Sequence, residues 1–197
     1  MKPLTDSQKR DRELAIQRAA TRVLAGRGFE ALTMEEVARE AGVAKGTLFL
    51  YYKGKEELVQ AVFSAMAEAF GAELKGLASS GAAPEDLLDR TILALLLHFD
   101  RKRDITGYSG GLPLAGPRRE ALRELFAGNM QTIAGILGLC AEGGLLDLED
   151  PLFAASALFG LCRGSNTYAR AAGRKLPAEE RARRVKGIFL NGMRKNA

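Results

Sequence analysis

Apolar residues recur at helical intervals along most of the chain. Near the N-terminus they follow the pattern i, i+3, i+4, i+7, i+8, at Ile16, Ala19, Ala20, Val23 and Leu24. This spacing places them on one side of a helix. We expect that helix to begin at Arg10, after an irregular leader over residues 1–8, and to end at Gly26 and Gly28. No segment of useful length has the two-residue period of a strand, so the pattern predicts an all-α protein.

Residues 33–55 predict two short helices joined by a tight turn. Thr33 precedes an apolar run and is followed three positions later by Glu36, which is the pattern of a reciprocal capping box at a helix start. Gly42 ends this first helix, and a second helix starts near Lys45. Two short helices joined in this way are typical of a helix-turn-helix, whose second helix enters a DNA groove.

The second short helix has two distinct faces. Leu48 and Tyr52 are four positions apart and share an inner face, whereas Thr47 and Tyr51 share a different one. We expect the inner face to hold the unit on its support and the other face to meet a partner.

The rest of the chain is also predicted to be helical. A long third segment carries apolar residues at helical spacing, at Leu58, Val62, Phe63, Met66, Phe70 and Leu74. Residues 79–84, SSGAAP, have the composition of a linker, and further helices are expected over 87–103, 118–142, 151–172 and 177–194. The pattern predicts an N-terminal three-helix domain over residues 8–68, with the helix-turn-helix at about 33–52, and a C-terminal helical domain over 79–197. About nine helices are expected in all.

Composition and charge indicate where the protein is located in the cell, but they do not identify a binding partner. The net charge is +5, but acidic and basic residues are interspersed, so charge alone is weak support for an anionic partner. The longest apolar run, residues 92–97, is far shorter than the ~20 residues of a membrane-spanning helix. The charged N-terminus lacks an apolar signal-peptide core. We therefore expect a soluble cytoplasmic protein without a membrane partner, with Cys140 and Cys162 as reduced thiols in the core.

One stretch resembles the tetracycline-repressor family of bacterial transcriptional regulators, namely residues 19–58, AATRVLAGRGFEALTMEEVAREAGVAKGTLFLYYKGKEEL. The shared features are a helix ending in Gly-Phe, a threonine before the second helix and Ala-Gly-Val in the turn. Gly-Thr-Leu on the recognition helix, an aromatic pair and Lys-Glu follow. One departure is Ala44, where the family often has a serine that caps the recognition helix; losing such a cap costs about 1 kcal/mol. Beyond residue 58 the resemblance is limited to helix number and length.

The resemblance implies a set of DNA contacts on and around the second short helix. The implied contact residues are Thr33, Lys45, Gly46, Thr47, Phe49, Leu50, Tyr51 and Lys55. Lys45 is expected to read base edges, and the other polar members to contact the phosphate backbone, which fixes register. Phe49 and Leu50 match positions that touch base methyls or sugars, and ordinary packing is the alternative for both.

In the C-terminal domain the resemblance implies a pocket for a small hydrophobic effector of unknown identity. The candidate pocket residues are His98, Tyr108, Phe126, Met130, Cys162 and Asn166, with Tyr168 as a further polar candidate. His98 is the only histidine, and a lone histidine on an apolar helix is usually a core residue. Because it has no partners at ligand spacing, no metal site is predicted, and no cofactor is implied.

The last two helices resemble the family's dimerisation pair. Small residues that allow close approach, and apolar residues that could cover them, are Ala154, Ala155, Ala157, Gly160, Ile188, Phe189 and Met193. A two-fold homodimer through these helices would place two recognition helices in successive major grooves of double-stranded DNA. A monomer that buries these helices internally is the alternative.

These features predict a DNA-binding transcriptional regulator, in the first instance a repressor that binds an inverted-repeat operator as a dimer and is released by its ligand. A transcriptional activator fits the same residues. A helical small-molecule-binding protein with a non-functional helix-turn-helix is a further alternative. An enzyme is not indicated, because the sequence shows no nucleophile–base pair and no metal cluster, so no catalytic residue is assigned.

Overall fold

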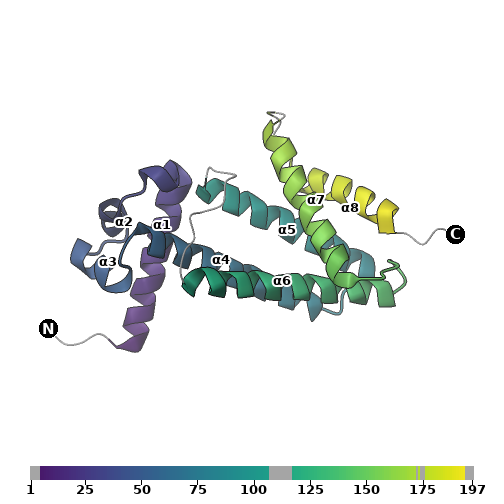
Figure 1. Cartoon of the computed structure of the whole chain (residues 1–197), viewed down its shortest axis with the longest axis horizontal. Coiled ribbons are helices and arrows are strands. Elements are labelled where there is room, and N and C mark those ends of the chain that lie inside the picture. The colour runs from purple at the N-terminus through teal and green to yellow at the C-terminus, as the bar shows by residue number, and fades with distance from the viewer. Residues whose placement is uncertain (1–4, 107–116, 172, 174–175, 194–197) are drawn as a thin grey trace. The chain divides into compact units, whose positions relative to one another are not determined.

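The computed structural model describes residues 5–106, 117–171, 173 and 176–193. Within these ranges the chain forms eight α-helices and no strand (Figure 1). The helices are α1 (Asp6–Ala31), α2 (Met34–Glu40), α3 (Lys45–Tyr51), α4 (Lys55–Ala78), α5 (Pro84–Thr106), α6 (Pro117–Glu142), α7 (Pro151–Ala171) and α8 (Ala178–Met193). The all-α prediction is confirmed, with eight helices in the described residues where about nine were expected.

The chain divides into two compact units. The first comprises residues 1–66 with 102–122, and the second comprises residues 67–101 with 123–197. Helix α4 contributes its first half to one unit and its second half to the other. The sequence predicted an N-terminal domain that ends at residue 68 and a C-terminal domain that starts at residue 79. These domain boundaries stay predictions.

Helix α1 begins earlier than its apolar pattern indicated. Its N-cap is Thr5, whose hydroxyl accepts from the Gln8 N–H at 3.3 Å while the Thr5 N–H donates to Gln8 Oε1 at 3.0 Å. This reciprocal capping box starts the helix at Asp6, so the expected irregular leader through residue 8 and the start at Arg10 are wrong. The first turns are exposed, and a helix that buries nothing there leaves no apolar periodicity to find.

The predicted end of the first helix is present as a break inside α1. Gly28 has φ +75° and ψ 176°, a conformation that favours glycine. One short turn follows, after which Leu32 is buried. The break redirects the chain toward α2, which packs against both α1 and α3 (Figure 1).

The core of the N-terminal unit includes the predicted apolar stripe of α1 and the predicted inner face at Leu48 and Tyr52. All five stripe residues of α1 are buried, as are Val37, Ala38, Leu48 and Tyr52. Tyr52 also brings a polar tip into this core. Its hydroxyl accepts from Gln17 Nε2 at 3.0 Å and donates to Glu13 Oε1 at 3.1 Å. The end of α3 is therefore fastened to α1 by burial and by hydrogen bonds together.

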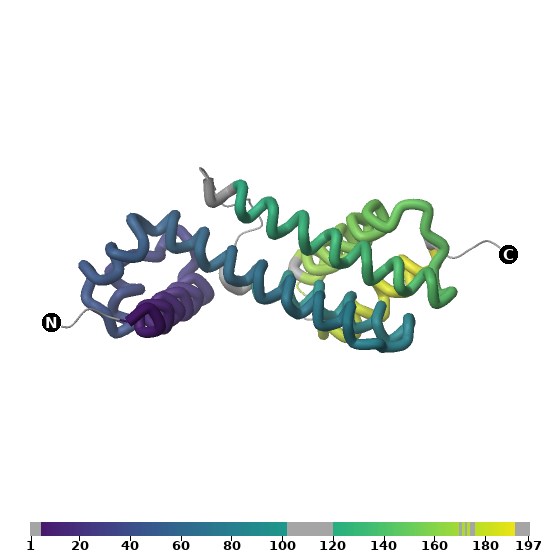
Figure 2. The backbone as a smooth tube through the Cα atoms, turned by 90° about the horizontal axis from the view of Figure 1, so that it is seen from below, coloured from purple at the N-terminus to yellow at the C-terminus, as the bar shows by residue number. Residues whose placement is uncertain are grey.

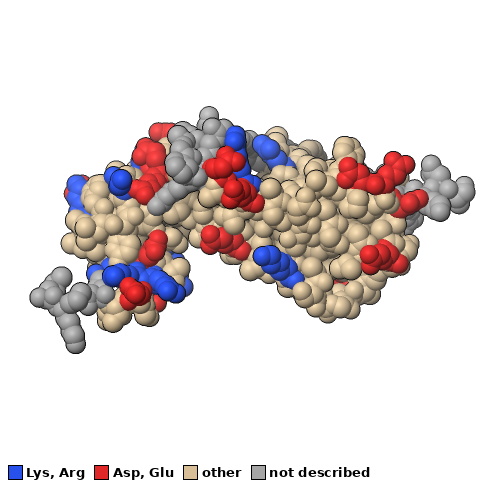
Figure 3. Space-filling view, turned by 60° about the horizontal axis from the view of Figure 1, so that its bottom comes forward, with Lys and Arg blue, Asp and Glu red and all other residues tan. Residues whose placement is uncertain are grey.

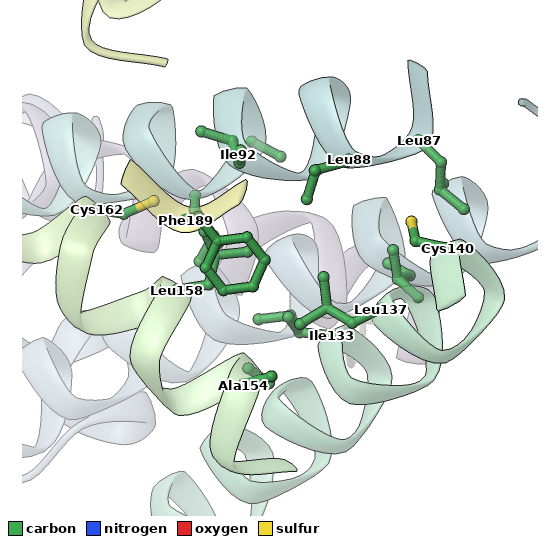
Figure 4. Close-up of a cluster of buried hydrophobic side chains, with 14 of the residues drawn as sticks. Leu87, Leu88, Ile92, Ile133, Leu137, Cys140, Ala154, Leu158, Cys162 and Phe189 are labelled. Carbon is green, nitrogen blue, oxygen red and sulfur yellow. The ribbon is translucent and has the colours of Figure 1, made fainter. Parts of the chain in front are cut away.

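The second unit buries a larger cluster contributed by α4 to α8 (Figure 4). Leu88, Ile92, Ile133, Leu137 and Leu158 lie at its centre and are fully buried. Helix α7 packs against α8, and Lys186 of α8 reaches α5, with Nζ 3.1 Å from Glu85 Oε1 and 2.8 Å from Asp89 Oδ2.

Both cysteines belong to this cluster, as predicted. Cys140 and Cys162 are free, buried, and lie at opposite ends of the group drawn in Figure 4. Burial raises the pKa of the Cys140 thiol to about 11 and that of Cys162 to about 12. Both thiols are therefore protonated near neutral pH, which makes them poor nucleophiles.

Helices α4 and α6 run alongside one another in this unit (Figure 2). Asn129 of α6 is buried and donates from Nδ2 to the Ala67 carbonyl at 2.9 Å. Its Oδ1 lies where a Cβ at Gly71 would stand. No such neighbour surrounds Gly76 of the same helix, where a Cβ would meet nothing within 4 Å. Gly71 thus permits the close approach of the two helices.

Gly71→Ala and Gly76→Ala should change stability in opposite directions. The new methyl group at position 71 displaces Asn129 and breaks its buried hydrogen bond, which should lower the free energy of unfolding by about 1–3 kcal/mol. At position 76 the same change adds helix propensity and should raise it by up to about 1 kcal/mol. Urea denaturation followed by circular dichroism measures both, and shifts of the same sign would contradict the packing described.

Tyr52→Phe should destabilise the N-terminal unit without changing its shape. The phenyl ring keeps the apolar contacts, but Gln17 and Glu13 lose their shared partner, which should cost about 1–2 kcal/mol of unfolding free energy. Tyr51→Phe is the matched control, because Tyr51 is only half-buried. Equal thermal-unfolding midpoints for the two variants would show that the Tyr52 hydroxyl contributes nothing.

Candidate DNA-binding surface and helical core

The turn between α2 and α3 has the geometry of a helix-turn-helix. The Thr33 hydroxyl caps α2 by accepting from the Glu36 N–H at 3.2 Å. Gly42 ends the helix at φ +66°, and the Val43 N–H returns to the Ala38 carbonyl at 3.0 Å. The predicted cap and the predicted stop are both confirmed.

Only half of the predicted capping box forms at α2. The Glu36 carboxylate accepts from Arg27 Nε at 3.1 Å and lies 3.6 Å from Arg39 Nη2. Glu36 therefore ties α2 to the end of α1, and the cap bond from the Thr33 hydroxyl stands without its reciprocal bond. The sequence pattern identified the helix start but not this competing use of the carboxylate.

Helix α3 begins without a side-chain cap. Ala44 occupies the N-cap position and makes no side-chain hydrogen bond, as its small side chain implied. Its carbonyl accepts from the N–H groups of Thr47 at 2.9 Å and Leu48 at 3.2 Å. The N–H groups of the first helical residues, Lys45 and Gly46, have no partner within the helix.

The predicted contact residues of α3 gather on its solvent side. Lys45, Gly46, Phe49 and Leu50 are exposed, and a Cβ at Gly46 would meet open space. Leu50 is 84% exposed and Phe49 43% exposed, so neither is a core residue of the N-terminal unit. Thr47 and Tyr51 are half-buried at the border of this face. Thr33 is exposed at the start of α2.

The two lysines predicted to contact DNA, Lys45 and Lys55, have different partners within the chain. Lys45 Nζ lies 3.3 Å from Glu35 Oε1 in a pair whose side chains are both more than half exposed. Such a surface pair is worth about 0–1 kcal/mol, so a phosphate or base can replace Glu35. Lys55 Nζ instead donates to the carbonyls of Phe29 at 3.3 Å and Glu30 at 3.4 Å, and stands 4.5 Å from the centre of the Phe29 ring. Its ammonium fastens the start of α4 to the end of α1.

The charge pattern around these helices is mixed. Arg22 Nε lies 2.6 Å from Glu40 Oε1, and Lys9 Nζ lies 3.1 Å from Asp6 Oδ1. In the face drawn in Figure 3, basic and acidic side chains stand next to one another. The surface in this view is therefore not uniformly basic.

The candidate pocket residues fall on several helices of the second unit. His98 is 4% exposed and stacks on Phe70, with ring centres 4.3 Å apart and planes at 24°. Its other side meets Phe99 edge-on at 6.0 Å, and Phe99 meets Phe159 at 4.8 Å. An aromatic row thus runs through α4, α5 and α7, with His98 as a member.

The remaining candidates vary in burial. Cys162 and Asn166 are buried, Met130 packs against the apolar cluster, and Phe126 is half-buried. Tyr108 lies outside the described residues. In the part of the chain that the structure describes, no group of three or more His, Cys, Asp or Glu is placed to hold a metal ion.

Asn166 brings in two residues that the sequence analysis missed. Its Nδ2 donates to Asp100 Oδ1 at 2.7 Å, and Asp100 Oδ2 accepts from Arg181 Nη2. Arg181 lies in the charged start of α8, AEERARR, a pattern typical of a solvated face. Nothing in that local pattern distinguishes the one buried arginine from its exposed neighbours.

A groove of about 650 Å³ lies along α7 and α8. It is lined by Ala157, Gly160, Leu161, Gly164, Ser165, Tyr168, Arg184, Val185, Ile188 and Phe189. Ala157 and Gly160 were expected on this surface, and Ile188 is 60% exposed. Ala154 and Ala155, which were expected on the same surface, are instead buried in the core of their own unit and do not line the groove. Nothing is described of the Met193 side chain.

Comparison with known proteins finds relatives of the N-terminal part of the chain. The model of the family described as bacterial regulatory proteins, tetR family, matches residues 16–62. The fatty acid metabolism regulator protein of Bacillus subtilis is 39% identical over 56 residues, which are 28% of this chain and 29% of the relative. The HTH-type transcriptional regulator YhgD of Bacillus subtilis is 33% identical over 100 residues, which are 49% of this chain and 50% of the relative. The chain thus spans half or less of the length of these curated relatives.

Solved structures share the whole fold at low identity. The fatty acid degradation regulator FadR of Bacillus halodurans has a TM-score of 0.77 and 20% identity, with 99% of this chain and 100% of that chain covered. Bacillus subtilis FadR in complex with stearoyl-CoA has a TM-score of 0.75 and 22% identity, covering 92% and 99%. A regulator of the TetR/AcrR family from Thermobifida fusca has a TM-score of 0.75 and 21% identity, covering 94% and 100%. Residues 16–62 of this chain thus match the tetR family of bacterial regulatory proteins, and the chain as a whole has the fold of these solved regulators.

Proposed function

We propose that this chain binds an inverted-repeat DNA operator as a two-fold dimer, represses the adjacent promoter, and is released by a small hydrophobic effector. The observation that carries the proposal is the outer face of α3. Its exposed residues are held on a fully buried support, inside the segment that matches the family. Such a protein acts where DNA is, in the cytoplasm.

The DNA contacts divide by chemistry. Lys45 and the exposed backbone at Gly46 face base edges in the major groove, and Phe49 and Leu50 offer apolar surface for thymine methyl groups. Thr33, Thr47 and Tyr51 contact phosphates through their hydroxyls. Lys55 contributes the backbone N–H at the start of α4, because its ammonium is already bound to α1.

The dimer forms through α7 and α8. Ala157, Gly160 and Gly164 lie three or four positions apart on one face of α7. Both glycines are exposed, so a helix of a second copy can approach closely. Exposed Ile188 of α8 and Tyr168 of α7 supply apolar area beside them. A two-fold axis here places the recognition helices roughly 34–36 Å apart or a multiple of it.

The effector occupies the helical core of the second unit. The candidates His98, Phe126, Met130, Cys162 and Asn166 combine an apolar lining with few polar groups, which suits a hydrophobic or amphipathic molecule. A relative is named for fatty acid metabolism, and a structural neighbour was solved with stearoyl-CoA. An acyl chain is therefore the first class to examine. Helix α4 belongs to both units and could therefore couple them. A ligand that binds one of two dimer states more tightly shifts the population toward that state, and DNA binding changes with it.

Replacing Lys45 and Tyr51 together by alanine should weaken operator binding by roughly a hundredfold. A base contact and a phosphate contact are lost, each worth about 1–3 kcal/mol, and about 1.4 kcal/mol is tenfold. The operator is first recovered by selecting bound sequences from a random DNA pool, and affinity is then measured by fluorescence anisotropy over a salt series. Lys75→Ala, at an exposed lysine near the end of α4, is the control. Unchanged affinity in a folded double variant would refute the assigned surface.

Gly160→Arg should convert the dimer to a monomer. A long charged side chain in the groove prevents close approach of a second copy, so light scattering after gel filtration should give half the mass. Gly128→Arg is the matched control, since Gly128 is an exposed α6 glycine with open space around its Cβ position. A variant that stays dimeric would place the interface elsewhere.

A further inference from the structure

Among the arginines of the second unit whose side chains the structure describes, one is buried. Arg181, near the start of α8, has a side chain that is only 4% exposed. Its neighbours Arg183 and Arg184 on the same helix are exposed. Burying a charged group is costly unless it is paired and hydrogen-bonded. The burial of Arg181 therefore requires a compensating partner, whereas an exposed arginine requires none.

The charge of Arg181 is compensated by Asp100. Its Nη2 donates to Asp100 Oδ2, and the other carboxylate oxygen accepts from Asn166 Nδ2 at 2.7 Å. These residues come from α8, α5 and α7, so three helices meet at one polar cluster. The buried guanidinium thus has a carboxylate as its partner within the chain.

Hydrogen bonding at Arg181 is incomplete. Among the residues that the structure describes, its Nε and Nη1 are buried and have no hydrogen-bond partner. Buried donors are nearly always satisfied in folded proteins, and leaving a donor unpaired after removing it from water is unfavourable. No described residue therefore supplies an acceptor for these two nitrogens.

Two buried residues of the apolar core lie one helical turn from this polar cluster. Cys162 precedes Asn166 by one turn on α7, and Val185 follows Arg181 by one turn on α8; both are fully or almost fully buried members of the core cluster. Burial raises the pKa of the Cys162 thiol to about 12, against the opposing influence of the Arg181 charge, so the thiol is neutral. Figure 4 shows Cys162 next to the apolar side chains of the cluster.

The charge state favours one kind of acceptor. Asp100 already pairs with Arg181, and a second anion on the remaining nitrogens would stand close to the Asp100 carboxylate at low dielectric, where like charges repel strongly. A neutral oxygen meets no such repulsion and satisfies the same donors. An uncharged carbonyl attached to an apolar chain matches both the free nitrogens and the apolar surroundings.

We infer that Arg181 is the polar anchor of the effector site, where Nε and Nη1 donate to the carbonyl oxygen of an uncharged ester, thioester or amide. The apolar part of the ligand lies along the neighbouring core, and a free carboxylate is disfavoured. The inference rests on the proposed function, in which the second unit binds a hydrophobic effector, and it adds the chemical group that is recognised.

The test compares three probes of equal chain length on the full-length protein. They are methyl dodecanoate, the free dodecanoate anion, and the corresponding methyl ether, which lacks the carbonyl. Isothermal titration calorimetry should give the ester an affinity roughly tenfold or more above both others, because a site built for a hydrogen bond discriminates against analogues that lack it. Equal affinity for ester and ether, tighter binding of the anion, or no binding of the ester would overturn the inference. Equal affinity would mean that these nitrogens hold only a buried water.

Two lysine variants test whether the preference for the ester depends on the Arg181 guanidinium. Arg181→Lys keeps the charge beside Asp100 but loses the planar fork of donors, and should remove the preference for the ester while leaving ether binding unchanged. Arg183→Lys, at an exposed position two residues later, should keep it. Should Arg181→Lys fail to fold, infrared spectroscopy of wild-type protein with ¹³C-carbonyl ester decides. A hydrogen-bonded carbonyl absorbs at lower wavenumber than the same ester in hexane, and an unshifted band would overturn the inference.

Measuring operator release in the same samples distinguishes the two proposals. Ester binding that depends on Arg181 but leaves DNA bound supports the anchor and contradicts the effector-controlled repressor. Release of DNA by the ester to the same extent in wild type and Arg181→Lys supports the repressor and contradicts the anchor.

Discussion

The attachment of α3 to α1 is the constraint on which the candidate DNA-binding surface depends. A helix of seven residues without a side-chain cap is too short to be stable alone. Burial of Leu48 and Tyr52, together with the bonds from the Tyr52 hydroxyl to Gln17 and Glu13, holds it in place. Because these contacts lie on the inner side of the helix, its outer face stays exposed to solvent.

Two buried polar side chains of the second unit illustrate different roles. Asn129 donates to the Ala67 carbonyl where α6 meets α4, in the space left by Gly71, and so stabilises a helix contact. Arg181 is also buried, but two of its nitrogens stay without a partner in the described residues. The Asn129 amide has its hydrogen-bond partner within the chain, so its role is in helix packing. The two Arg181 nitrogens have no such partner, and the proposed ligand would supply it.

The family match concerns one segment of the chain, whereas the fold likeness concerns its whole length. The family model covers residues 16–62, where the residues that face solvent on α3 can be compared position by position. The rest of the chain shares a helical fold with regulators at 20–22% identity, which says nothing about the side chains of a pocket. The proposals for the second unit therefore stand on its own contacts and burial.

The sequence by itself determined the helices, the helix-turn-helix and the faces of α3, because caps, glycine stops and three-to-four-residue spacing act within a few residues. It could not determine how distant side chains pair. Asp100 is 66 positions from Asn166 and 81 from Arg181, and the Lys55 ammonium meets carbonyls 25 and 26 positions away. Such contacts depend on how helices pack, so the inward side of Ala154 and Ala155 and the burial of one arginine among several were decided only by the tertiary structure.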